Sequence, residues 1–314
     1  MFTVFAAALA MSPVEATLKL VASKPLVGVR AINISAAPTG TKFAITAEDN
    51  SVRIYDAATR QLIKTMTGHP QQAMAIAWSQ DGTMIATGDE SARIFVWSAS
   101  TGAKLRELRG HQRGIQNLCF NYPRTLLLST GKDDAMKVWD LSTGKVKATI
   151  LGKGANFFGG TFKAKGNDIG VGVLNIGGRL YGPDFKVKGF LTGHGGQGVF
   201  DIDFNKAGTR ALTCGKDGNG AIWDVKAMSR LNYLRGHKDW VVWGNFSPNG
   251  KYVATSSTDT TVRVWNIYSY RPELVLENQS SLGSPLAWTG NGKYLITVNL
   301  DGFLTVNEIA PAQG

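Results

Sequence analysis

The sequence predicts an all-β fold, a seven-bladed β-propeller of four-stranded antiparallel blades, from three recurring features. Aromatic side chains recur every 42 residues, and Gly-His pairs and alternating apolar runs recur with them. The stations with this spacing are the aromatic residues Tyr55, Trp97, Trp139, Tyr181, Trp223 and Trp265, followed by Asn307. A period of roughly 40–45 residues with Gly-His and Trp-Asp marks is typical of four-stranded propeller blades. A lone blade cannot bury both faces, so the blades must stack in a ring.

Through these marks the chain resembles the WD-repeat β-propeller family, from about Thr17 to Ala310. The clearest repeat begins at Gly236-His237, passes a Pro-Asn-Gly turn and ends at Trp265-Asn266. The other Gly-His pairs are Gly68-His69, Gly110-His111 and Gly193-His194. The fourth blade is degraded, because Gly152-Lys153 replaces Gly-His and Tyr181-Gly182 replaces Trp-Asp.

The ring is expected to close through the N-terminal strand. The last repeat offers three strands, at 284–288, 293–298 and 303–308. Thr17–Ser23 alternates like a strand but has no partner before it, and a propeller avoids an exposed edge only if this strand completes the last blade. The resemblance implies the same closure. We therefore expect one domain over residues 17–314, with Leu18 and Leu20, or Lys19 and Val21, buried opposite Phe303–Glu308.

Residues 1–16 differ in kind from the rest. Phe2–Met11 is apolar but too short to span a bilayer, so no membrane span is expected. Small residues follow in the pattern of a cleavage site, as at Val14-Glu15-Ala16, but no Lys or Arg precedes the apolar run. Two alternatives stay open: a signal peptide on an exported protein (secreted or periplasmic), or a disordered N-terminus on a cytoplasmic one.

The charge pattern favours acidic partners. The chain carries 34 basic and 23 acidic residues, a net charge of +11. Eight basic residues against two acidic ones lie between Lys145 and Lys188, which makes binding of nucleic acid or another polyanion an alternative function. The same alternating lysines are also typical of solvated outer strands. Cys119 and Cys214 lie two blades apart in apolar runs and are expected to be free thiols.

Histidine, hydroxyl and carboxylate side chains recur together in a way that imitates a catalytic triad. An active site is needed once, whereas this set returns with the repeat. The resemblance implies that the set, with the tryptophan, forms a buried hydrogen-bond network in each blade. Mutual satisfaction of buried polar groups supports that role. The residues assigned to it are His111, Ser129, Asp133, Trp139, His194, Thr213, Asp217, Trp223, His237, Thr255, Asp259 and Trp265.

Blade 2 departs from this set, because Ser91 stands at the aspartate station and Asp89 could substitute from the turn. His69 is therefore expected to be the most loosely held histidine. All four histidines lie in Gly-His pairs, which leaves none for catalysis or metal binding. We predict neither an enzyme nor a cofactor site.

The resemblance implies that partners dock on the loops that enter each blade's first strand. The residues expected on that face are Trp240, Phe200, Phe158, Lys216, Lys132, Gln116 and Arg30. Exposed aromatics with basic neighbours are typical of binding hot spots. The predicted function is a non-catalytic scaffold for a protein or peptide with an acidic segment, as a monomer or within a complex. A propeller enzyme is a third alternative, which perturbed acids in the channel mouth would favour.

Overall fold

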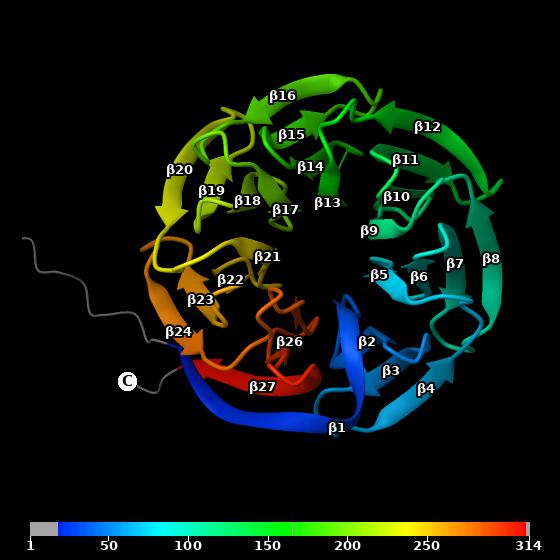
Figure 1. Cartoon of the computed structure of the whole chain (residues 1–314). Helices are drawn as coiled ribbons and strands as arrows, with labels where there is room; N and C mark the ends of the chain where they lie inside the picture. The colour runs from blue at the N-terminus through cyan, green and yellow to red at the C-terminus, as the bar shows by residue number, and fades with distance from the viewer. Residues whose placement is uncertain (1–17, 165, 312–314) are drawn as a thin grey trace, which may run out of the picture.

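A computed structural model describes residues 18–164 and 166–311, and it forms a ring of seven blades around a central channel (Figure 1). This confirms the predicted all-β propeller. Neighbouring strands within every sheet are antiparallel, and blades 1 to 6 run in chain order from the channel outward. Five blades are separate four-stranded sheets, and the first and last share one seven-stranded sheet.

The strand bounds follow the repeat. Blades 1 and 2 hold β1 (Leu18–Ala36), β2 (Lys42–Ala47), β3 (Val52–Asp56), β4 (Leu62–Met66), β5 (Ala73–Trp78), β6 (Met84–Asp89), β7 (Arg93–Ser98) and β8 (Lys104–Arg109). Blades 3 and 4 hold β9 (Ile115–Phe120), β10 (Leu126–Gly131), β11 (Ala135–Asp140), β12 (Lys145–Leu151), β13 (Phe157–Phe162), β14 (Ile169–Val173), β15 (Gly177–Tyr181) and β16 (Val187–Leu191). Blades 5 to 7 hold β17 (Val199–Phe204), β18 (Arg210–Gly215), β19 (Gly220–Asp224), β20 (Ser229–Leu234), β21 (Val241–Phe246), β22 (Tyr252–Ser257), β23 (Val262–Asn266), β24 (Pro272–Leu276), β25 (Ala287–Trp288), β26 (Tyr294–Val298) and β27 (Phe303–Pro311).

The hydrophobic core lies between blades rather than within one. One cluster joins Leu212 and Ile222 of blade 5 to Val253 and Trp265 of blade 6. The two middle strands of a blade are buried on both faces, as in β22, whereas an outer strand such as β20 is mostly exposed. Each blade therefore buries its apolar faces only when it stacks on its neighbours.

The N-terminal strand closes the ring, as predicted. The first half of β1 pairs antiparallel with β27, and its second half turns inward to pair with β2 (Figure 1). One strand thus serves as the outer strand of blade 7 and the inner strand of blade 1. No sheet edge is left open at this junction.

The expected burial along the closing strand is wrong. Leu18–Leu20 lie opposite Ile309–Pro311, and Phe303 pairs with Arg30 instead. Leu18 is buried, but Lys19, Leu20 and Val21 are exposed. The reason is that β27 continues past Glu308, and an outer strand has solvent on one side.

Residues 1–16, where a signal peptide or disordered segment is expected, lie outside the described residues. Within 18–164 and 166–311, no helix is long and apolar enough to cross a membrane. Cys119 and Cys214 are both free. Burial raises the pKa of both thiols, which therefore stay protonated at neutral pH.

Candidate functional site

The recurring histidine sets form closed hydrogen-bond networks in blades 3, 5 and 6. In blade 6 the Trp265 indole donates to the Thr255 hydroxyl at 2.7 Å. His237 places Nε2 2.9 Å from that hydroxyl and Nδ1 3.0 Å from the Asp259 carboxylate. The same pattern joins Trp139, Ser129, His111 and Asp133 in blade 3, and Trp223, Thr213, His194 and Asp217 in blade 5.

These networks tie the loop that enters a blade to the middle of that blade. Burial alone would raise the pKa of Asp259, but hydrogen bonds from the Lys238 N–H, Thr261 and His237 outweigh it and lower the pKa to about 2. Burial lowers the pKa of His237 against the opposing pull of Asp259. The hydroxyl that imitates a nucleophile is hydrogen-bonded to two buried side chains, which suits a structural tie.

Blade 2 corrects one expectation. His69 places Nδ1 2.8 Å from Asp89 and Nε2 2.6 Å from Thr87, and Trp97 donates to Thr87 at 2.7 Å. His69 is buried and is not loosely held. Asp89 replaces the missing aspartate because it lies at the end of β6, where its other oxygen accepts a hydrogen bond from Ser91.

Blades 4 and 7 are held differently. Tyr181, at the tryptophan station of blade 4, is buried, and its hydroxyl lies 3.3 Å from Nη1 of Arg179. In blade 7 the Asn307 amide donates to Thr297 at 3.1 Å and accepts from Ser23 of the closing strand at 2.8 Å. The last blade therefore couples its network to ring closure.

On the loop face, three of the expected residues form a continuous aromatic run, which we call the aromatic rim (Phe158, Phe200 and Trp240). Phe158 meets Phe200 edge-on at 5.6 Å between ring centroids, and Phe200 meets Trp240 at 5.6 Å and 35°. The Lys216 ammonium lies 4.7 Å from the Trp240 ring centroid. The rim crosses blades 4, 5 and 6 and has a cation at one end.

The three rings are not equally exposed. Trp240 exposes 41% of its surface, whereas Phe200 exposes 8% because it packs between the other two rings. Phe200 thus supports the rim instead of presenting a free face. Trp240 does pack against the neighbouring blade, and it remains accessible there.

The other expected loop-face residues are engaged with their neighbours. Lys132 forms an ion pair with Glu90 at 2.6 Å, and Arg30 faces Glu48 at 3.9 Å. The Gln116 amide nitrogen can donate to the carbonyls of Gly131 and Phe157. None of these contacts involves a residue of the aromatic rim.

Sequence reasoning missed two leucines of blade 7. Leu282 is 84% exposed in the loop that enters this blade, and Leu300 is exposed in the turn between β26 and β27. Leu300 lies two repeats after Lys216, at the equivalent position of its blade, so the repeat spacing could have placed it on this face. Gly283, beside Leu282, packs closely against Val242 of blade 6. Exposed apolar side chains therefore occur on consecutive blades of this face.

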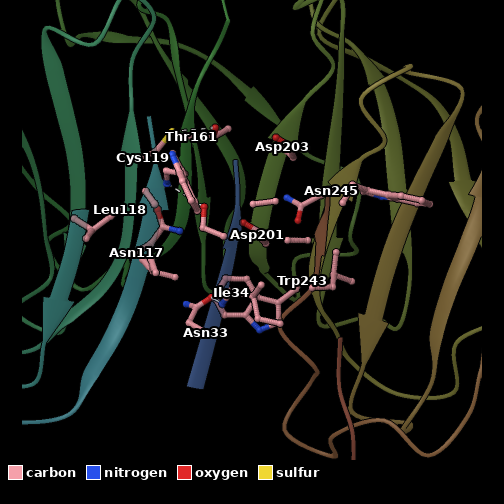
Figure 2. A pocket seen from close by; sticks show the side chains of 18 of the residues that line it. Asn33, Ile34, Asn117, Leu118, Cys119, Thr161, Asp201, Asp203, Trp243 and Asn245 are labelled. Atoms are coloured by element: carbon pink, nitrogen blue, oxygen red, sulfur yellow. Dashed lines mark hydrogen bonds between the residues drawn. The ribbon is translucent and has the colours of Figure 1, made fainter. Parts of the chain in front are cut away.

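The channel holds polar side chains that connect neighbouring blades. Asp201 and Asp203 point from β17 toward the channel, and Asn117, Cys119 and Asn245 project into it from other blades (Figure 2). Each acceptor receives a backbone N–H from the next inner strand: Gly160 to Asn117 at 3.1 Å, Phe162 to Cys119 at 3.4 Å, Gly244 to Asp201 at 3.2 Å and Phe246 to Asp203 at 2.8 Å. These bonds bridge blades 3 to 4 and 5 to 6 around a cavity of about 290 Å³.

The two aspartates are the perturbed acids of the channel. Burial raises the pKa of Asp201 to about 8, with Asp203 adding to the shift and the Gly244 and Ile202 N–H groups opposing it. Burial likewise raises the pKa of Asp203 to about 6. Carboxyl groups with a raised pKa also occur at catalytic sites. Here, however, each of the two aspartates accepts a backbone hydrogen bond that connects two blades. Gly159 leaves room for Asp201, since a Cβ there would lie 2.2 Å from Oδ1.

The basic segment of blades 3 and 4 is partly neutralised. Asp168 lies 2.9 Å from Lys188 and 3.9 Å from Lys163. Lys145 and Lys147 are exposed on the outer strand β12. Lys145, Lys147 and Lys188 thus lie on the outer strands β12 and β16.

Comparison with known proteins places this geometry in context. The family model described as "WD domain, G-beta repeat" matches residues 60–98, 102–140, 185–224 and 228–266. Each match spans the outer strand of one blade and three strands of the next, so the sequence repeat itself links neighbouring blades. The repeats of blades 1, 4 and 7, which lack the Gly-His pair and the tryptophan, are unmatched.

Three curated relatives match parts of this chain. Protein HIR1 of Cryptococcus neoformans is 28% identical over 173 residues, which cover 49% of this chain and 20% of that protein. Autophagy-related protein 16 of Arabidopsis thaliana is 28% identical over 38% of this chain and 24% of its own length. The guanine nucleotide-binding protein subunit beta of Saccharomyces cerevisiae is 34% identical over 22% of this chain and 16% of its own length. The matches thus span less than a quarter of each relative.

Proposed function

The chain belongs to the WD-repeat family, whose matched repeats account for half of its 314 residues, and from that premise we propose that it is a non-catalytic scaffold. It binds another protein or peptide through the loop face around the central channel. The observation that carries this proposal is the aromatic rim, in which Trp240 stays exposed while it packs on Phe200, which in turn packs on Phe158.

The rim has the composition of a binding hot spot. Its rings are already fixed by contact with one another, so little side-chain entropy is lost when a partner covers them. A large ring that is both rigid and accessible can contribute most of the binding energy of an interface. Leu282 and Leu300 on blade 7 add apolar surface to the same face.

Lys216 indicates the chemistry of the partner. Its ammonium group lies over the Trp240 ring, so a partner that covers the indole also meets a positive charge. With a net charge of +11, the chain as a whole attracts acidic segments. We therefore propose that the rim binds a partner segment that combines acidic and apolar side chains.

A non-catalytic role agrees with where the reactive groups lie. The Ser and Thr hydroxyls of the repeated sets each accept an indole N–H and meet a histidine. The channel carboxylates accept backbone N–H groups from the next blade. Structural ties between and within blades therefore account for these groups.

The test is selection of peptides from a displayed random library against the chain. Selected peptides should be rich in acidic and apolar residues. The Trp240→Ala substitution should weaken their binding by about 2 kcal/mol, or roughly 30-fold. Tyr268→Ala is the matched control, because Tyr268 is another exposed aromatic with a cation, Arg210, 5.4 Å from its ring. Tyr268 lies in the β23–β24 turn on the opposite face. Binding that ignores Trp240 but depends on Tyr268 would place the partner there.

Nucleic-acid binding is the competing function and makes a different prediction. It would use the outer lysines, so reversing Lys145, Lys147, Lys186 and Lys188 together would abolish binding while Trp240→Ala had no effect. Affinity would also fall steeply with salt, because each phosphate contact releases counterions. That result would remove the rim from the function.

A further inference from the structure

A groove lies on the loop face beside the degraded blade 4. Its volume is about 580 Å³, and it lies between the loop that enters blade 3 (residues 110–113) and the segment that enters blade 4 (residues 151–156). The turn at 132–135 lines it between them. Gly152-Lys153 stands in this segment where other repeats have Gly-His, so no histidine network ties it down.

The segment is nonetheless held in a defined shape. The carboxylate of Asp134 accepts the N–H of Gly154 at 2.5 Å and that of Asn156 at 2.9 Å. The backbone carbonyl of Asp134 accepts the Gly152 N–H at 2.8 Å. The groove wall is therefore built before any partner arrives.

An exposed leucine marks the groove as a contact surface. Leu151 ends the outer strand β12 and is 61% exposed. The residue at the same station is polar in four other repeats, Thr67, Arg109, Arg235 and Glu277, and the two remaining stations hold Gly193 and Pro25. Leu151 thus places a branched apolar side chain inside the groove, where it suits contact with an apolar side chain of a partner.

Two cations that line the groove form no ion pair with any residue in 18–164 or 166–311. Of its two acids, Asp133 already faces His111 and the Gln112 N–H, and Asp134 faces the two N–H groups named above. Arg113 is exposed and forms no hydrogen bond or ion pair with any residue in 18–164 or 166–311. The Lys137 side chain donates to Thr149 at 3.1 Å and to no other residue in the described ranges. These two cations lie in the groove with Leu151.

We propose that this groove is a second docking site, which takes an acidic peptide segment of a partner protein. An apolar side chain of the segment rests on Leu151, and a neighbouring carboxylate pairs with Arg113 and Lys137. The site stands independently of the aromatic rim, since it shares no residue with Phe158, Phe200 or Trp240.

The test measures binding of a labelled synthetic peptide, with leucines interspersed among glutamates, to the full chain at low salt. Arg113→Glu should weaken binding at least about tenfold, because it replaces attraction by repulsion. Leu151→Ser should weaken it at least about fivefold, because it removes the apolar contact. Both side chains are exposed, so both variants should keep the melting temperature of the parent chain.

Matched controls separate the groove from general charge and from the rim. Lys145→Glu reverses an exposed cation at the other end of β12, and Leu105→Ser removes an exposed leucine of β8. Because the rim also takes acidic-apolar segments, all these variants are made in a Trp240→Ala chain, in which both controls should leave affinity unchanged. Loss of all saturable binding in the Trp240→Ala chain would place the peptide on the rim and overturn the groove site while supporting the proposed function.

Three further results would overturn the groove proposal. One is the absence of saturable binding by the acidic peptide, and another is an equal loss with Lys145→Glu. The third is equal binding of a peptide in which lysines replace the glutamates, because the proposed contact requires negative charge. An oligonucleotide that displaces the peptide and depends on Arg113 would assign the groove to nucleic acid instead.

Discussion

A single buried hydroxyl ties blade 6 together. Thr255 accepts the Trp265 indole N–H and meets His237, which in turn meets Asp259. Removal of the carboxylate leaves the buried Nδ1 of His237 with the Thr261 hydroxyl, 3.1 Å away, in place of a charged acceptor. Removal of the tryptophan instead leaves a cavity between blades, because Trp265 is fully buried.

These two losses should differ in size. Asp259→Ala should lower the free energy of unfolding by about 1–3 kcal/mol, and Trp265→Ala by about 3–5 kcal/mol. Urea unfolding measures both. Asp301→Ala is the matched control, since Asp301 is exposed at the same station of blade 7 and should change stability by about 0.5 kcal/mol or less. Loss of a hydrolytic activity in Asp259→Ala, with stability unchanged, would contradict the structural role.

The channel aspartates make stability depend on pH in the opposite sense to most carboxylates. Because the folded chain raises the pKa of Asp201 from 3.8 to about 8, folding favours its protonated form. Its contribution is fully present below about pH 4 and is lost as pH rises through about 8. Asp259, with its pKa lowered to about 2, instead stabilises above about pH 4 and is lost as pH falls toward 2.

Asp201→Asn should therefore stabilise the protein increasingly as pH rises. Asparagine keeps an acceptor for the Gly244 N–H, and it already occupies the equivalent stations Asn33 and Asn117. We expect the variant to gain about 1–3 kcal/mol over the parent chain between about pH 5 and pH 8. Thermal unfolding across that range measures the gain. Asp184→Asn, at an exposed carboxyl, should show no such trend, and a flat difference for Asp201→Asn would refute the linkage.

At the scale of elements, β1 carries the ring closure. It pairs with β27 over its first half and with β2 over its second, and Ser23 bonds to Asn307 where the outer strand crosses the last network. Loss of its first half would leave β27 with a row of unpaired backbone groups.

A chain that begins at residue 24 should aggregate and melt at a lower temperature. Size-exclusion chromatography and thermal unfolding test this. Ser23→Ala is the control, because it removes one hydrogen bond, about 0.5–1.5 kcal/mol, but keeps the strand. A truncated chain that stays monomeric with unchanged melting would show that the closing pairing is dispensable.

At the scale of the whole molecule, the net charge of +11 should act mainly on the rate at which acidic partners arrive. Lys216→Glu should slow association with an acidic peptide selected on the rim, and the difference should fade as salt rises. Stopped-flow mixing at several salt concentrations measures it. Lys188→Glu, already paired with Asp168 on an outer edge, should have a smaller effect. Equal effects of both variants would mean that the overall charge acts without the rim.

The sequence by itself determined the fold and the networks. A period of 42 residues fixes one blade per repeat, and three strands left over at the C-terminus require a fourth from the N-terminus. The histidine, hydroxyl, carboxylate and tryptophan residues lie within one repeat, so their meeting follows from local spacing. The aromatic rim was also predictable from the sequence, because Phe158 and Phe200 occupy the same repeat position on neighbouring blades.

Tertiary structure alone decided what depends on contact between repeats. The 42-residue period does not fix distances between side chains or between strands. Three features depend on those distances: the burial of Phe200 under its neighbours, the hydrogen bond between Asp89 and His69, and the register of β1 against β27. The repeat spacing places the channel carboxylates at polar positions equivalent to Asn33 and Asn117, so their polarity was predictable. Their raised pKa values, however, require the desolvation that a closed ring produces. The repeat specifies what each blade contains, whereas burial and charge pairing arise only where two blades meet.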